Sequence, residues 1–213
     1  MSNFDLVLKA FWVTIQLLVF SGIASLVFGT VLGACRVGPV AVLAKAASVY
    51  VTMVRNTPLL VVFIFVFNGL PQIDLLVGVP FLVKGVIALT VYTSAFVCEA
   101  IRSGVNSISI GQAEASRAIG LTFGQSMQTV ILPQAFRAVV PPLASVLIAL
   151  AKNTSVAAAF GLMEATARMR YFTNNHPEDR TLIFLTFAIG YIIIVEVMSA
   201  GAMGLERRWK VAR

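Results

Sequence analysis

The sequence predicts an all-α integral membrane protein with five transmembrane helices in a single domain, residues 1–213. Of its residues 59% are hydrophobic and only 12% are charged, whereas about a quarter of the residues in soluble domains are charged. Five apolar runs are near the ~20 residues that a spanning helix needs. These runs are residues 10–34, 48–69, 81–101, 139–159 and 181–205. The net charge of +7 is therefore interpreted first as a topology signal in the loops, and not as a sign of nucleic-acid binding.

The first run carries small residues at helical spacing. Gly29 and Gly33 form a GxxxG pattern, and small residues at that spacing allow two helices to approach closely. The segment 32–35 imitates a lipoprotein cleavage site, but the apolar run is far longer than the core of a signal peptide, so we expect no cleavable segment. Cys35 and Cys98 lie in apolar contexts without a CxxC spacing, which argues against a metal site or a disulfide framework.

Four of the five runs contain polar residues where a spanning helix should be apolar. Ionisable side chains inside a membrane are costly, and each is by default a candidate for a functional site. In the second run these residues are Arg55, Asn56 and Thr57, followed by Pro58. In the later runs they are Tyr92, Thr93, Ser94 and Glu99, then Lys152, Asn153, Thr154 and Ser155, and finally Glu196.

An odd number of spans places the two termini on opposite sides of the membrane. One side receives Arg36, Lys45, Arg102, Arg117 and Arg137 together with the tail cations Arg207, Arg208, Lys210 and Arg213. On the other side, Lys9, Lys84, Arg168, Arg170 and Arg180 are diluted by five acidic residues. The positive-inside rule then predicts an external N-terminus and a cytoplasmic C-terminus.

Residues 112–133 form a loop of a different character. Alanines and apolar residues at 113, 115, 118, 119 and 121 give a compact apolar side at helical spacing, while Glu114 and Arg117 are too polar for a bilayer core. Gly120 predicts a helix end with a positive-φ turn, and Pro133 predicts a second break. We expect a helix, a glycine turn and a short helix beside the membrane surface. The simpler interpretation is an ordinary amphipathic connector.

The order of residues in this loop resembles a known motif. Glu114-Ala115-Ser116, then Gly120, then Ile131-Leu132-Pro133 resembles the EAA loop of ABC importer permeases, with Ser116 in place of a second alanine. Segments 55–61, 92–99, 102–104, 111–115, 131–135 and 152–155 extend the resemblance to the polar amino-acid permease family of ABC importers. It covers residues 11–168 and is strongest toward the glutamate permeases of that family.

The resemblance implies a type I ABC importer permease of the bacterial plasma membrane, with a cytosolic coupling loop at residues 102–137. Such a subunit pairs with a second permease, either a copy or a paralogue, engages two ATP-binding cassette ATPase subunits, and receives substrate from an extracytoplasmic binding protein. It is not an enzyme and holds no cofactor or metal. The expected substrate is an acidic amino acid, glutamate or aspartate. The alternative is another polar amino acid, such as glutamine, arginine or histidine.

Two sets of residues follow from the resemblance. The residues expected to couple to the ATPase are Glu114, Ala115, Ser116, Ala118, Gly120, Leu132 and Pro133. The residues expected along the substrate path are Arg55, Asn56, Thr57, Tyr92, Thr93, Ser94, Glu99, Lys152, Asn153, Thr154, Ser155 and Glu164.

Other classes of function fit the sequence less well. No GxxxxGK[ST] phosphate loop is present, so ATP would have to be hydrolysed on another chain. The lone His176 lies in a polar outer loop without the companions that a metal site requires. A secondary carrier would show a longer chain or internal repeats. A membrane scaffold has no reason to keep Arg55, Lys152 and Glu196 inside its spans.

The two cations inside the spans allow alternative explanations. Arg55 either extends to the membrane surface or forms an ion pair with Glu196 or Glu99, since the helical rise places all three at a comparable depth of ~10 Å. Lys152 lies deeper, ~20 Å along its span, with no acidic residue expected at its own level. Glu164 could reach back to neutralise it, or Lys152 could be the counter-charge of a substrate carboxylate.

Overall fold

A computed structural model describes the backbone of residues 3–209 and the side chains of residues 3–206. Within this part of the chain the regular structure is entirely helical, which confirms the predicted fold class. The α-helices are α1 (Asn3–Val37), α2 (Ala41–Arg55), α3 (Leu59–Ile64), α4 (Phe81–Asn106), α5 (Ile110–Ala118), α6 (Phe123–Ser126), α7 (Leu132–Asn153), α8 (Ala165–Asn175) and α9 (Arg180–Trp209). Short π or 3₁₀ turns, η1 (Phe65–Gly69), η2 (Leu70–Ile73), η3 (Met127–Ile131), η4 (Thr154–Phe160) and η5 (Pro177–Asp179), connect or extend them.

Among the described residues, four helical segments are long and apolar enough to cross a membrane: Asn3–Val37, Phe81–Asn106, Phe123–Phe160 and Pro177–Glu206. The second apolar run, expected as one helix over residues 48–69, is broken instead, because Ala41–Arg55 and Leu59–Ile73 meet at an angle of 104°. Pro58 has no N–H to donate and disfavours helical backbone at the residue before it. The polar segment at residues 55–58 is therefore a bend between two shorter helices.

The helix that contains the fourth apolar run begins earlier than expected. Pro133 was predicted to break the chain, and this prediction was wrong, because residues 123–160 form one continuous helical segment. Pro133 lies where the π turn η3 passes into α7, and local π adjustments of this kind allow a spanning helix to accommodate a proline. The wider π turn of η3 directly precedes it. Pro141 and Pro142, expected at the start of the span, lie inside α7.

Helices α1 and α4 pack in parallel at very close range, as the GxxxG pattern predicted. A Cβ atom added at Gly29 would lie 2.5 Å from Val97 Cβ, and one added at Gly33 would lie 3.0 Å from Ile101. On the opposite helix, a Cβ at Gly85 would lie 3.1 Å from Leu17. In all three contacts the residue numbers of the two partners differ by the same amount. Helix α4 therefore runs parallel to α1 and is fixed in register against it.

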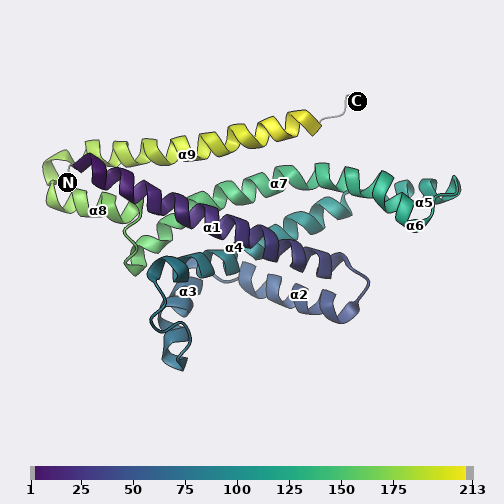
Figure 1. The fold of residues 1–213 in the computed structure, drawn as a ribbon, viewed down its shortest axis with the longest axis horizontal. Helices are drawn as coiled ribbons and strands as arrows, with labels where there is room; N and C mark the ends of the chain where they lie inside the picture. Colours follow the sequence, from purple (N-terminus) through teal and green to yellow (C-terminus); the bar gives the residue numbers. More distant parts are fainter. Residues whose placement is uncertain (1–2, 210–213) are drawn as a thin grey trace.

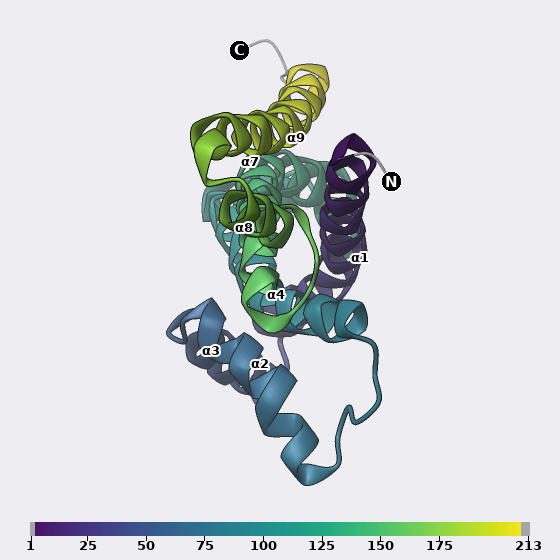
Figure 2. The same cartoon turned by 90° about the vertical axis from the view of Figure 1, so that its left-hand side faces the viewer.

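The long helices share a common direction, with α5 and α6 at one end (Figure 1). Helix α8 and the beginnings of α1 and α9 lie at the opposite end (Figure 1). We call the first the α5 end and the second the α8 end. Helices α2 and α3 lie to one side of the group formed by α1, α4, α7 and α8 (Figure 2). The tail cations Arg207, Arg208, Lys210 and Arg213 lie outside the side chains that the structure describes.

Candidate functional site

The α5–α6 element is built from two local capping motifs. Helix α5 ends in a Schellman motif, in which Gly120 N–H donates to Arg117 C=O at 2.9 Å and Leu121 N–H donates to Ser116 C=O at 3.1 Å. Gly120 has φ +86°, which confirms the predicted positive-φ turn at a residue without a Cβ. Thr122 and Gln125 then form a capping box that starts α6.

This element presents an apolar surface at its tip. Ile110, Ile119 and Phe123 are 77%, 78% and 72% exposed, and exposed apolar side chains that gather in one place are informative, whereas single ones are not. Of the residues expected to couple to the ATPase, Glu114, Ala115, Ala118, Gly120, Leu132 and Pro133 are exposed. Ser116 is buried, and its hydroxyl donates to Ala113 C=O at 2.8 Å. The tip is therefore an exposed apolar feature held by two capping motifs.

The residues expected along the substrate path are distributed over several places. Arg55 Nη1 lies 3.3 Å from Glu99 Oε2, so of the two expected partners the structure selects Glu99 and not Glu196. Asn56 is exposed in the bend after α2, and the Thr57 hydroxyl donates to Met53 C=O. The bend thus holds Arg55 at Glu99, while its two polar neighbours serve the local backbone or face outward.

A groove of about 380 Å³, which we call the α4 groove, lies between α4 and α7. Tyr92, Thr93, Phe96, Ser145 and Asn153 line it, with Val146 and Ala149. The Thr93 hydroxyl is buried and has no hydrogen-bond partner among the described residues, and an unpaired buried hydroxyl is costly. Such a group gains most from a polar ligand in the groove.

Ser94 does not take part in this groove. Its hydroxyl lies 2.9 Å from the Tyr50 hydroxyl and donates to Val91 C=O, so it faces α2. The Thr154 hydroxyl is likewise satisfied locally, by Ala151 C=O at 2.7 Å. Both hydroxyls were expected along the substrate path, and the structure assigns both to internal hydrogen bonds.

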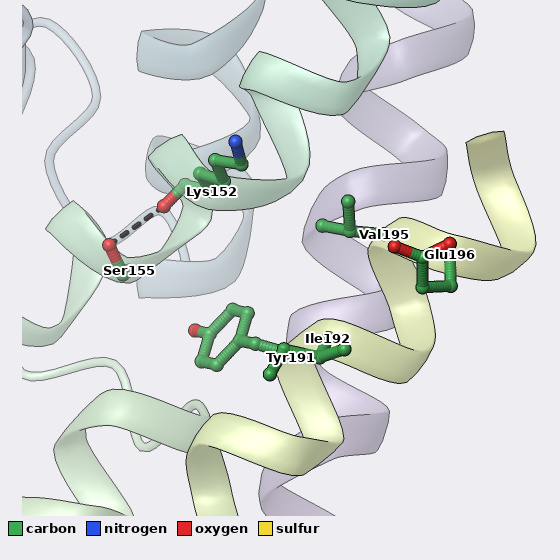
Figure 3. A pocket seen from close by; sticks show the side chains of 6 residues that line it. All are labelled: Lys152, Ser155, Tyr191, Ile192, Val195 and Glu196. Atoms are coloured by element: carbon green, nitrogen blue, oxygen red, sulfur yellow. Dashed lines mark hydrogen bonds between the residues drawn. The ribbon is translucent and has the colours of Figure 1, made fainter.

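Lys152 lines a different pocket, of about 430 Å³, between α7 and α9. Glu196 of α9 lines the same pocket, with Tyr191, Ile192 and Val195 (Figure 3). The expectation that no acidic residue lies at the level of Lys152 was therefore wrong. Among the described residues, no carboxylate lies within 4.0 Å of the Lys152 ammonium. Ser155 donates to Lys152 C=O at 2.7 Å.

One explanation of Lys152 required the Glu164 carboxylate to reach back and neutralise it, but Glu164 binds other residues instead. Its Oε1 accepts from the Ala167 N–H at 2.9 Å and caps the first turn of α8, and its Oε2 accepts from the Tyr191 hydroxyl at 2.8 Å and the Thr14 hydroxyl at 3.4 Å. Thr14 in turn accepts from Ala165 N–H. The carboxylate is fully buried and joins α1, α8 and α9 at the α8 end. Its role is to position these helices.

The two cavities flank one face of α7. Ser145, Ala149 and Lys152 are exposed and spaced i, i+4 and i+7, so they form a stripe along one side of the helix. Ser145 and Ala149 line the groove between α4 and α7, and Lys152 lines the pocket between α7 and α9, which we call the Lys152 pocket. A partner that covered this stripe would join the groove and the pocket into one polar path.

Sequence reasoning missed several residues of these sites. Arg36 and Arg102 both bind Glu99, at 2.5 Å each, but as cations near span ends they were interpreted only as topology signals. Thr14 and Tyr191 are single polar residues in apolar runs, and only their distance from Glu164 shows their role. The i, i+3 spacing of Glu99 and Arg102 was the one local signal available.

Comparisons with known proteins agree on one class of protein. Residues 25–211 match the family described as binding-protein-dependent transport system inner membrane component. The chain is 41% identical to the glutamate transport system permease protein GluC of Corynebacterium glutamicum, over 97% of this chain and 95% of the relative. It is 36% identical to the probable glutamine ABC transporter permease protein GlnP of Bacillus subtilis, over 93% and 91%. The crystal structure of an amino acid ABC transporter with histidines superposes with a TM-score of 0.87 at 26% identity, covering 96% and 94%.

The buried Glu164 predicts a specific pH dependence of stability. Burial raises the pKa of its carboxyl above the ordinary value of 4.5, against the opposing effect of its hydrogen bonds. A raised pKa stabilises the fold fully below the ordinary value, and this contribution is lost as the pH rises through the raised value. We therefore expect Glu164→Gln to remove a fall in the thermal stability of the purified protein as the pH rises above 4.5.

Asp74→Asn is the matched control, because Asp74 is exposed and forms no ion pair among the described residues. This variant should keep the wild-type pH dependence. If the Glu164→Gln and wild-type melting temperatures run parallel across that pH range, then protonation of Glu164 does not contribute to folding.

Proposed function

The chain belongs to the family of binding-protein-dependent transport system inner membrane components, and from that premise we propose that it carries an acidic amino acid, glutamate or aspartate, into the cell. It is a multi-pass membrane permease subunit of an ABC importer. The name of the relative GluC supports the acidic substrate. Relatives named for glutamine and arginine make these two amino acids the alternative substrates.

One observation carries the proposal: Lys152 and Glu196 line the same pocket on facing helices (Figure 3), and Lys152 has no ion-pair partner among the described residues. An amino acid is a zwitterion, so its carboxylate matches Lys152 and its ammonium group matches Glu196. An acidic substrate brings a second carboxylate, for which the donors of the neighbouring α4 groove, Tyr92, Thr93 and Asn153, provide hydrogen bonds. An uncompensated charge inside a membrane protein is costly unless an anion balances it.

The path requires a cover, because Ser145, Ala149 and Lys152 are exposed on this chain. A second permease, a copy or a paralogue, packed over this stripe would enclose the groove and the pocket. In this arrangement an extracytoplasmic binding protein delivers substrate to the α8 end, and the α5 end faces the cytosol. The N-terminus then lies outside and the C-terminus inside.

The α5–α6 tip supplies the contact with the ATP-binding cassette ATPase. Its exposed Ile119 and Phe123 would enter a groove on that subunit, a common mode of helix recognition. Because α6, η3 and α7 are continuous, a displacement of the tip moves the whole helix that carries Lys152. ATP hydrolysis on the partner is in this way linked to the substrate path.

Uptake of radiolabelled amino acids into proteoliposomes tests the proposed function directly. With the ATPase and the binding protein present, we expect ATP-dependent uptake of glutamate or aspartate. Lys152→Met should reduce that uptake at least tenfold, as loss of a charge-assisted contact predicts, while basal ATP hydrolysis is retained. Lys45→Met, on the exposed side of α2, is the matched control. Uptake of glutamine, arginine or histidine alone would contradict an acidic substrate.

A glycine substitution in the tip tests the coupling role. Gly120→Val places a β-branched side chain at φ +86°, a conformation that such residues resist. The tip should lose its shape while the spanning helices stay inserted, so ATP hydrolysis should no longer depend on substrate. Gly204→Val, at a glycine of α9 whose Cβ would have nothing within 4 Å and whose φ is ordinary, lies outside the tip and should retain coupling. Full uptake by the Gly120→Val transporter would remove the tip from the coupling mechanism.

A further inference from the structure

Three arginines converge on a single carboxylate near the α5 end of α4. Arg36 from α1, Arg55 from α2 and Arg102 from α4 all lie within 4.0 Å of the Glu99 oxygens. The arginine contacts join three helices that are separate in sequence. Three guanidinium groups on one carboxylate leave two positive charges without a counter-charge among these four residues, which we call the Glu99 cluster.

The cluster has hydrogen-bonding capacity that Glu99 cannot use. Each guanidinium carries five N–H donors, whereas a carboxylate accepts about four hydrogen bonds in total. Arg36 offers one nitrogen to Glu99, Arg102 offers Nε and Nη2, and Arg55 offers only Nη1. Most of the N–H groups of the cluster are therefore not used by Glu99, and those of the exposed Arg55 can reach another anion.

The three arginines are not held equally. Arg36 and Arg102 bind Glu99 at 2.5 Å, and the Arg36 side chain is only 17% exposed. Arg55 is the outermost member, at 3.3 Å and 43% exposed. Because Arg36 and Arg102 alone satisfy both oxygens of Glu99, Arg55 can exchange Glu99 for a carboxylate on a ligand without leaving a buried charge unpaired.

The cluster continues directly from the α4 groove. Tyr92, Phe96 and Glu99 are spaced i, i+4 and i+7 along α4, so they lie on one face of the helix. Tyr92 and Phe96 line the groove, and the Arg55 guanidinium lies 5.7 Å from the centroid of the Phe96 ring, on the ring face. From Tyr92 to Glu99 the helix rises about 10 Å, which carries the polar path from the level of Asn153 toward the α5 end.

We propose that the Glu99 cluster is a second anion site of the transporter, in which Arg55 releases Glu99 and binds a carboxylate of the acidic amino acid after it leaves the Lys152 pocket. This inference rests on the proposed function and deepens it, because it assigns the side-chain carboxylate as the feature that the inner site recognises. A bidentate guanidinium–carboxylate pair provides both the charge and the geometry for this recognition. An amide side chain of the same size lacks the charge and cannot replace Glu99 on Arg55.

Ligand-induced stabilisation of the purified full-length permease with its partner subunits tests the site. The melting temperature is measured against L-glutamate and L-glutamine at equal ionic strength, in a Lys152→Met background that removes the outer counter-charge. We expect glutamate to raise the melting temperature more than glutamine does. Arg55→Gln should abolish this difference, through an apparent affinity for glutamate lowered about tenfold.

Two further variants separate recognition from structure. Arg55→Lys keeps the charge and should restore part of the difference between glutamate and glutamine, whereas Lys45→Gln on the same helix should leave it unchanged. An equal glutamate effect in Arg55→Gln and in its parent overturns the inference, as does the absence of any difference between the two ligands in the parent. The acidic substrate is decided separately by uptake into proteoliposomes with Lys152 intact, so the two failures are distinguishable.

Discussion

The close parallel contact of α1 and α4 is the constraint on which the rest of the structure depends. Gly29 and Gly33 bring the two backbones so near that even one methyl group would clash at Gly29. With one side of α4 fixed against α1, Tyr92, Phe96 and Glu99 occupy another side, toward α7 and α2. Packing between small residues is the main source of helix association in a membrane, where apolar surface provides little driving force between helices. The position of the polar path is thus determined by residues that are themselves apolar.

Three charged residues differ in how completely neighbouring groups match their charge and their hydrogen-bonding capacity. Glu164 has donors for both oxygens from three elements and is fully buried, so it fixes the α8 end of the molecule. Glu99 is also fully paired, but its partners exceed its charge. Lys152 has no ion pair among the described residues. The excess positive charge of the Glu99 cluster and the Lys152 ammonium, which shares its pocket with Glu196, are the two features on which the proposed stepwise movement of an anion rests.

Much of the fold could be predicted from the sequence because apolar length and small-residue spacing are local properties. The positive-φ turn at Gly120 and the close approach at Gly29 follow from single residues. The bend at Pro58 and the uninterrupted helix through Pro133 could not be assigned this way, since one proline ends a helix and the other is accommodated next to a π turn. The partners of Glu99, Glu164 and Lys152 depend on how helices cross, which no local pattern contains. The burial of Ser94 against Tyr50 depends on tertiary packing in the same way.

The central claim is that the face of α4 with Tyr92 and Phe96 forms a wall of the substrate path. Its most direct test is the modification of single cysteines by a charged thiol reagent, in a transporter with Cys35 and Cys98 replaced by alanine. Tyr92→Cys and Phe96→Cys should react, and L-glutamate should slow both reactions, whereas Val83→Cys, exposed near the start of the same helix, should be insensitive to L-glutamate. Equal rates at positions 92 and 96 with and without glutamate, in a transporter that imports it, would place the path elsewhere.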